Sequence, residues 1–231
     1  MRLFFSPIYI RYYIKKRALM SHFSEILKEN CIGIPYKYIE FVERSLLISY
    51  SYPTIRAYHN WKHIEDCLEE LKQMEDTWEI PTIRNGIILA LYYHDCVYEP
   101  LKDDNEERSA ERAVIDLMAL GMPEKFTNLV SDLIMLTKHT GEATDFPGEI
   151  VMDIDLAVLG KSSKIFRNYE DNIRVEYSGY SSRVYREGRI KVLEHFMNKP
   201  KIYQTMYFFK KYEDSARKNI EQSLKELKWY L

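Results

Sequence analysis

The sequence predicts an all-α protein, folded as a single-domain helical bundle. Its 231 residues are 46% hydrophobic, which is enough apolar material to bury one substantial core. Glycine and proline are scarce, with eight residues each, and no stretch shows the regular apolar–polar alternation of a half-buried strand. We therefore expect one helical domain over residues 35–231, preceded by a basic, aromatic extension over residues 1–34.

The first three helices of this domain are predicted from periodicity and proline positions. Pro35 opens a helix that runs to about residue 50. A second helix covers about residues 58–75, and its apolar side chains recur every three or four residues, as an inward face requires. Pro81 starts a third helix that ends near residue 95, because Pro100 prevents much continuation.

The remaining helices follow the same cues. One covers about 106–120 and is closed by Gly121, and the next runs from Pro123 to about residue 139. A further helix starts at Pro147 and ends near residue 160. Three more are expected at about 163–178, 182–198 and 201–229, the last with a break near Tyr212.

The N-terminal segment leaves several interpretations open. Residues 1–20 carry five basic groups and no acidic one, and they suit an extra packed helix, a weak targeting segment or an extension before a second start at Met20. No cleavage pattern of a secretory signal and no apolar run near the roughly 18 residues of a membrane span is present. Three cysteines without C-x-x-C spacing favour a reducing compartment, so we expect a cytoplasmic protein with no membrane span.

Charge argues against one class of partner. The net charge is −2, and beyond residue 20 the chain holds 28 basic against 35 acidic groups. An acidic body repels a polyanion unless a basic pocket intervenes, so we expect no nucleic-acid polymer as a partner. No sequence feature indicates an oligomeric state.

A set of histidines and aspartates is the strongest functional signal. His63, the pair His94-Asp95 and Asp155 combine two imidazoles with two carboxylates, a mixed nitrogen and oxygen set that suits Mn, Mg, Fe, Co, Ni or Zn. They stand on separate expected helices, and helical bundles build metal sites from side chains of different helices. His59 lies one helical turn before His63 and would face the same way. The pattern therefore predicts a divalent-metal hydrolase site.

These residues also carry a resemblance to a known family. The block Tyr58-His59-Asn60-x-x-His63-Ile64-x-Asp66, followed by His94-Asp95 and Asp155, resembles the HD superfamily of metal-dependent phosphohydrolases, and its first motif is similar to that of the cyclic nucleotide phosphodiesterases. A wider match resembles small bacterial proteins described as predicted metal-dependent HD phosphohydrolases and spans about residues 35–229. That match includes Asn105-Glu106-Glu107-x-Ser109-Ala110, Thr137-Lys138-His139, Asp153-x-Asp155-Leu156-Ala157-x-Leu159-Gly160, Ile173-Arg174-x-Glu176-Tyr177 and Gly188-Arg189.

The resemblance implies a fold of the HD and phosphodiesterase type and a role for each matched residue. His63, His94, Asp95 and Asp155 correspond to the four metal ligands, with Asp95 bridging if a second ion is present. Asp155 is preferred to Asp153 because it stands in the Asp-Leu context of the superfamily. In the phosphodiesterases, the histidine at the place of His59 protonates the leaving oxygen. This chain lacks the His-Pro-Gly that follows their His-Asp pair, so the resemblance implies neither cyclic nucleotide hydrolysis nor a second metal.

Five further residues are weaker candidates. Glu107 could activate water or bind a second metal, although Asp104-x-x-Glu107 also fits a helix capping box. His139 could bind substrate as part of the site or simply suit the dipole at a helix end. Lys138, Arg174 and Arg189 are candidates for binding a substrate phosphate, against the plain alternative of solvated or paired side chains.

Three functions follow as hypotheses. The favoured one is a metal-dependent phosphohydrolase that cleaves a small phosphoester, with a nucleotide as one candidate, by attack of metal-bound hydroxide on phosphorus. The second is a non-catalytic HD protein that senses a metal or a nucleotide. The third is a di-iron oxygenase, which would need more ligands than the four above.

Overall fold

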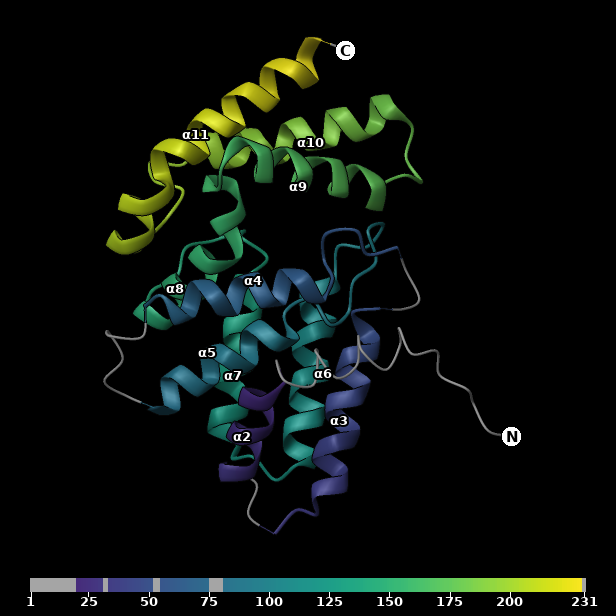
Figure 1. Ribbon diagram of the computed structural model, residues 1–231, viewed down its shortest axis with the longest axis vertical. Coiled ribbons are helices and arrows are strands. Elements are labelled where there is room, and N and C mark those ends of the chain that lie inside the picture. Colours follow the sequence, from purple (N-terminus) through teal and green to yellow (C-terminus); the bar gives the residue numbers. More distant parts are fainter. Residues whose placement is uncertain (1–19, 31–32, 52–54, 75–80, 230–231) are drawn as a thin grey trace.

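The computed structural model describes residues 20–30, 33–51, 55–74 and 81–229, and these residues form helices and no strand (Figure 1). The all-α prediction is therefore confirmed for the described chain. Its elements are α2 (Ser21–Asn30), α3 (Tyr36–Ser49), α4 (Trp61–Lys72), α5 (Pro81–Tyr93), α6 (Asn105–Ala119), α7 (Glu124–Leu136), α8 (Phe146–Asp155), the 3₁₀ helix η2 (Leu156–Gly160), α9 (Ser163–Glu176), α10 (Ser182–Met197) and α11 (Met206–Trp229).

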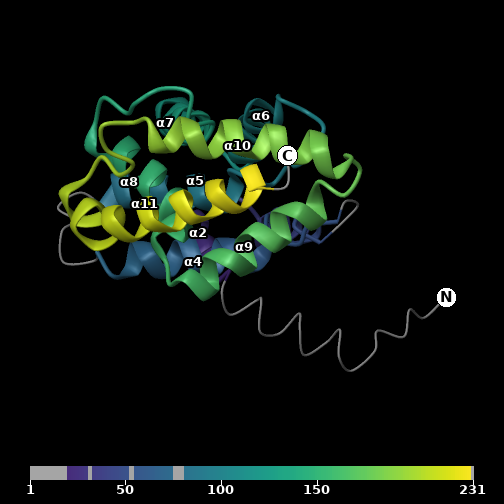
Figure 2. The same cartoon turned by 90° about the horizontal axis from the view of Figure 1, so that it is seen from above.

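The helices are arranged around α5. Every residue of α5 from Gly86 to Tyr93 is buried, so this helix is apolar on all sides, as a helix inside a bundle must be. At Gly86 an added Cβ would lie 3.0 Å from Leu129, which shows how closely α7 approaches. In Figures 1 and 2, α9, α10 and α11 cover one end of the molecule, α2, α3 and α6 lie toward the other, and α4 and α8 lie between.

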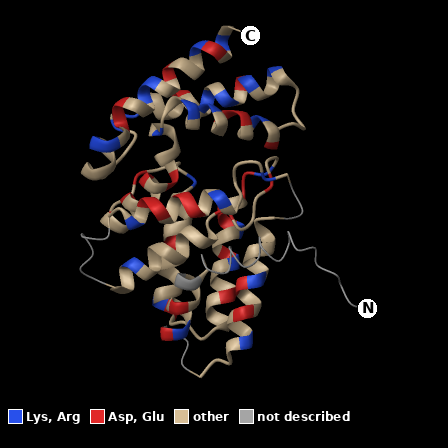
Figure 3. Ribbon diagram, viewed as in Figure 1, with Lys and Arg blue, Asp and Glu red and all other residues tan. Residues whose placement is uncertain are grey.

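Charged residues follow this division. Lys and Arg recur along α9, α10 and α11, whereas α4 carries several acidic residues between them and the rest of the bundle (Figure 3). The arrangement brings basic side chains of one layer opposite acidic side chains of the next. This arrangement allows ion pairs to form between helices that are far apart in the sequence.

Predictions for three helices differ from the structure, and each difference has a structural cause. α11 runs unbroken through Tyr212, because this ring is buried over Gly160, where no Cβ obstructs it, and its hydroxyl donates to Glu70. α7 ends at Leu136, three residues early, and His139 takes a left-handed conformation with φ +54° beyond it. The second helix also begins late, at Trp61, where Asn60 accepts from the backbone N–H of Lys62 at 2.7 Å.

Part of the predicted N-terminal extension packs into the bundle. Phe23 and Leu27 of α2 are fully buried, and the Phe23 ring meets Tyr92 of α5 edge to face at 5.2 Å. Residues 1–19, on which the three interpretations of the basic segment rest, lie outside the described residues, as does Cys31. Cys67 and Cys96 are buried free thiols. Among the described helices, none combines the length and apolar character that crossing a bilayer requires.

Candidate metal centre

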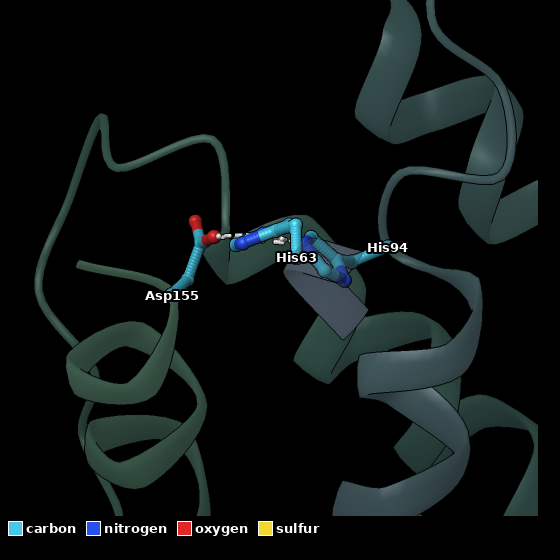
Figure 4. A group of neighbouring side chains, drawn as sticks. All are labelled: His63, His94 and Asp155. Carbon is cyan, nitrogen blue, oxygen red and sulfur yellow. Dashed lines mark hydrogen bonds and ion pairs between the residues drawn. The ribbon is translucent and has the colours of Figure 1, made fainter. Parts of the chain in front are cut away.

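Three helices converge on the predicted ligands. His63 lies in the first turn of α4, His94 and Asp95 follow the last residue of α5, and Asp155 is the last residue of α8. Figure 4 shows the side chains of His63, His94 and Asp155 pointing toward one another from these separate elements. His94 and Asp95 directly follow the last residue of α5, and both side chains approach the ring of His63.

The donor atoms of these side chains are within ligand-to-ligand distance. His63 Nε2 lies 3.1 Å from His94 Nε2 and 3.1 Å from Asp155 Oδ1, and His94 Nε2 lies 3.5 Å from Asp155 Oδ1. Asp95 Oδ2 is 3.1 Å from His94 Nε2 and 3.5 Å from His63 Nε2. Bonds of about 2.1 Å at angles of about 90–110° separate two donors by roughly 3.0–3.4 Å. His63, His94 and Asp155 therefore fit the coordination shell of one divalent ion, and Asp95 lies against its two histidines.

The tautomer of His94 adds to this fit. His94 Nδ1 lies 3.0 Å from the carbonyl oxygen of Leu91, which can only accept, so Nδ1 carries the proton. In neutral His94 the lone pair is then on Nε2 and faces the cluster. A hydrogen bond from the ring nitrogen that does not bind the metal is the usual way in which proteins orient a ligating imidazole.

The carboxylates of Asp95 and Asp155 favour a positive charge beside them. Asp95 Oδ2 is buried and accepts no hydrogen bond from the described residues. Burial alone would raise the pKa of Asp95 and Asp155, yet the surrounding histidines hold both below the ordinary value. Burial alone would lower the pKa of His94, but the charges of Asp95 and Asp155 raise it well above its ordinary value. In the protein alone a proton satisfies this demand, and a metal ion would satisfy it with the donor geometry already present.

His139, a predicted substrate-binding residue, instead contacts a predicted ligand. Its Nε2 donates to Asp155 Oδ2 at 2.8 Å, so Asp155 presents Oδ1 to the two histidines and is fixed through Oδ2. The backbone of His139 is left-handed, an uncommon state outside glycine that is seen at functional sites. His139 therefore orients Asp155.

His59 lies beside the cluster, where a hydrogen bond and a stacked ring hold its imidazole. Its Nδ1 donates to Glu176 Oε2 at 2.6 Å, and its ring stacks on Tyr98 with centroids 4.0 Å apart. Glu176 Oε1 also accepts from the backbone N–H groups of Tyr58 and His59 at 2.7 and 2.9 Å. Burial would lower the pKa of His59, but the charge of Asp95 and the bond to Glu176 raise it above its ordinary value. A protonated His59 is thus stabilised next to the cluster.

Asp153, the alternative to Asp155, has a structural role. It is fully buried, and its two carboxylate oxygens accept from the backbone N–H groups of Gln204 and Thr205, each at 2.8 Å, and from the Thr205 hydroxyl at 2.7 Å. These bonds hold the segment that enters α11. The structure does not place Asp153 as a hydrogen-bonder of a ligand imidazole.

Glu107 and Lys138 pair with each other. Their side chains form an exposed ion pair, and Lys138 Nζ also donates to the carbonyl oxygen of Asp103 at 2.8 Å. The capping box predicted for Asp104 and Glu107 is wrong, because the Asp104 side chain caps no backbone N–H of α6. The pKa of the neighbouring Glu106 is raised, mainly by burial and also by the negative charge of Asp95.

Arg174 and Arg189 use their donors within the α9–α10 pair. Arg174 donates to the carbonyl oxygens of Tyr177 and Tyr180 at 2.8 and 3.3 Å and so ties down the loop after α9. Arg189 is buried, pairs with Glu170, and donates to the Tyr169 hydroxyl at 2.8 Å. These contacts do not support the prediction that the two arginines bind substrate phosphate.

Sequence reasoning missed two residues that shape the site. Glu176 holds His59 from 117 positions away, and the only hint was its place in the motif Ile173-Arg174-x-Glu176-Tyr177. Tyr58 places its ring 4.8 Å from that of His63 and 4.6 Å from that of Tyr169. Burial raises the pKa of Tyr58 well above its ordinary value, so it forms a neutral wall of the site.

Comparison of the chain with models of known protein families, with curated proteins and with solved structures finds no match in any of the three. The role of this centre is therefore argued from its own residues.

Proposed function

We propose that this protein is a metal-dependent phosphohydrolase that acts on a small phosphoester. One observation carries the proposal: donor atoms of His63, His94 and Asp155 meet at the ends of three helices, with Asp95 against the two histidines and His59, an imidazole whose pKa is raised, beside them. A metal set next to a protonated histidine is what hydrolysis of a phosphoester requires, since attack on phosphorus and departure of the leaving oxygen occur at neighbouring points.

The four side chains would hold the ion, and Mn, Mg, Fe, Co, Ni and Zn all accept such a mixed set. When bound, the ion lowers the pKa of a coordinated water and neutralises charge on a phosphoryl oxygen. His139 keeps Oδ2 of Asp155 engaged, so that Oδ1 stays directed at the histidines. The half-buried Tyr58 packs its ring against His63 and forms one wall of the site.

His59 is the proposed general acid. With Nδ1 donating to Glu176, the proton available to a leaving group is the one on Nε2. The raised pKa keeps this proton in place closer to neutral pH, where it is of use to a departing oxygen. His59→Ala is expected to retain the metal and to lose turnover mainly on esters with poor leaving groups. An equal loss on an activated aryl phosphate would contradict the role.

Two aspartates of α8 provide the decisive test. Asp155→Asn removes a proposed ligand, whereas Asp153→Asn changes a fully buried carboxylate of the same helix that accepts from Gln204 and Thr205. We expect Asp155→Asn to lose bound metal, measured by mass spectrometry after dialysis against Mn²⁺, together with hydrolysis across a panel of nucleotides, cyclic nucleotides and sugar phosphates.

The control variant Asp153→Asn should unfold at lower urea concentration yet keep its metal. Metal retained in Asp155→Asn, or lost equally in both variants, overturns the assignment. Metal without hydrolysis of any phosphoester in the wild-type protein would instead favour a sensor or an oxygenase.

A further inference from the structure

A single arginine connects the two segments that form the centre. Arg56 precedes α4, and its guanidinium donates to three backbone carbonyl oxygens: His59 at 2.9 Å, Asp95 at 2.7 Å and Cys96 at 3.3 Å. The first belongs to the segment before α4, and the other two belong to the turn after α5. One side chain therefore bridges segments that are 39 positions apart in the sequence.

Both segments determine where metal-binding atoms lie. The carbonyl oxygen of Asn60 accepts from the backbone N–H of His63 at 3.1 Å, so the segment at residues 56–60 fixes the start of α4 and with it His63. The turn held by Arg56 contains Asp95 and directly follows His94. The 3.1 Å separation between the two imidazole nitrogens thus depends on the distance between these segments.

The surroundings of Arg56 match a bridging role. No carboxylate lies within salt-bridge distance of its guanidinium among the described residues, so the charge is not there to neutralise an acid. The guanidinium instead packs 5.4 Å from the ring centroid of buried Tyr50 and 5.5 Å from that of Tyr98, the ring that stacks on His59. Cation–π contacts on these rings fix the plane of the fork.

The opposite side of the same segment is held by a carboxylate. Glu176 accepts the backbone N–H groups of Tyr58 and His59, while Arg56 donates to the carbonyl oxygen of His59. Asn60 Nδ2 adds bonds to the carbonyl oxygens of Arg56 and Ala57 at 3.1 and 2.9 Å. Hydrogen bonds from Arg56, Glu176 and Asn60 thereby hold a segment without helix or strand directly before His63.

We propose that Arg56 is a positioning residue that sets the spacing between His63 and the His94-Asp95 pair, so that metal affinity depends on a side chain that touches no ligand side chain. The inference rests on the proposed metal-dependent function. Partners that orient ligands from outside the coordination shell are worth roughly 10–100-fold in metal affinity. Arg56→Met removes all three donors and is expected to weaken Mn²⁺ or Co²⁺ binding by at least about 10-fold.

The matched control is Arg112→Met. Arg112 also bridges elements, donating to Ser45 of α3 at 2.7 Å and to Asp116 of α6 at 2.6 Å, but it bonds neither segment of the centre. We expect it to lower the stability of the fold and to leave the dissociation constant for Co²⁺ and the visible spectrum of the bound ion unchanged. Equal metal affinity in Arg56→Met and wild type would overturn the proposal.

Hydrogen exchange of the metal-free protein gives a second, independent readout. In Arg56→Met, amide exchange should accelerate in the peptides around residues 57–61 and 94–98 together and stay unchanged in α11. If exchange in these two peptides does not change, Arg56 does not connect them. Wild-type protein that binds no metal in the same titration would refute the proposed function, whereas the exchange result bears on Arg56 alone.

Arg56→Lys covers the case in which the Met variant does not fold. Lysine keeps the charge but is a point donor that cannot hold carbonyl oxygens of both segments in the fixed geometry of a fork. A several-fold weaker affinity for Co²⁺ in Arg56→Lys is expected. Affinity equal to wild type would contradict the need for the guanidinium.

Discussion

Helix α4 contributes to two buried polar clusters that differ in one respect. His63 belongs to the metal-centre cluster defined above, and Glu70, two turns later on the same face, belongs to a second cluster with Lys161, Lys211 and Tyr212. Each carboxylate oxygen of Glu70 has donors: Oε1 accepts from Lys161 and Tyr212, and Oε2 accepts from Lys211 at 2.8 Å. In the metal-centre cluster, imidazole nitrogens of His63 and His94 and carboxylate oxygens of Asp95 and Asp155 face one another, and Asp95 Oδ2 accepts no hydrogen bond from the described residues.

This difference separates a structural ion-pair cluster from a candidate site. Burying charge is costly unless partners compensate it, so a closed cluster contributes to the fold, whereas an open one persists where something else completes it. In the Glu70 cluster the completing charges are on the chain itself. In the metal-centre cluster the missing charge is positive, and we propose that a divalent ion supplies it.

The largest expected effect separates the two clusters by metal affinity. His63→Ala removes a donor whose Nε2 faces both His94 and Asp155, and it should weaken Mn²⁺ binding by more than the roughly 100-fold upper range for an outer partner. Glu70→Gln should leave the dissociation constant unchanged. Isothermal titration of both variants with Mn²⁺ measures the two affinities. Equal losses of affinity would show that the two clusters do not differ in metal binding.

A second contrast concerns the stability of the metal-free protein. Glu70→Gln replaces a buried acceptor with a group that accepts on one side only, and Lys161 and Lys211 are both partly exposed and can turn toward water. We expect a loss of about 2 kcal/mol in the free energy of unfolding, measured in urea. A change within about 0.5 kcal/mol, the scatter of ordinary surface substitutions, would show that the closed cluster does not stabilise the fold.

Added metal should stabilise the fold only through the open cluster. At 100 times the dissociation constant, a ligand that binds the native state alone adds about 2.7 kcal/mol. For a chain of this size the melting temperature should rise by roughly 5–10 °C and fall again on chelation. In Glu70→Gln, added metal should raise the melting temperature by the same amount from a lower metal-free value. In Asp155→Asn, added metal should not raise the melting temperature. A full increment in Asp155→Asn would place the ion elsewhere.

The smallest effect is a pH dependence of the closed cluster. Burial would raise the pKa of Glu70, but its bonds to Lys161, Lys211 and Tyr212 outweigh burial and lower it. A carboxyl with a depressed pKa contributes stability above its unfolded pKa and loses it as the pH falls through the folded value. The stability difference between wild type and Glu70→Gln should thus be constant near neutral pH and shrink below about pH 4. A difference that instead grows on acidification contradicts the assignment.

The two clusters also differ in how far sequence could predict them. His63 and His94 are two of only six histidines, and with Asp95 and Asp155 they form a spaced pattern on separate predicted helices. Glu70 stands among four acidic residues of α4, and its partners lie 91 and 141 positions away, so no local signal marks it.

The same limit explains the other differences between sequence and structure. The partners of His59 and Asp155 arise from packing of α9 and from a left-handed residue after α7, neither of which has a periodic signature. The continuity of α11 at Tyr212 depends on Gly160, a contact between distant residues. Arg56 carries no signal in the sequence, and only its three carbonyl partners in the structure mark it.

The central claim is that a divalent ion completes the cluster at the ends of α4, α5 and α8. Anomalous X-ray diffraction from crystals grown with Mn²⁺ tests it most directly. The account predicts an anomalous peak within about 2.0–2.3 Å of His63 Nε2, His94 Nε2 and carboxylate oxygens of Asp95 and Asp155. A cluster without such a peak, with its histidines still in direct contact at saturating Mn²⁺, would contradict it.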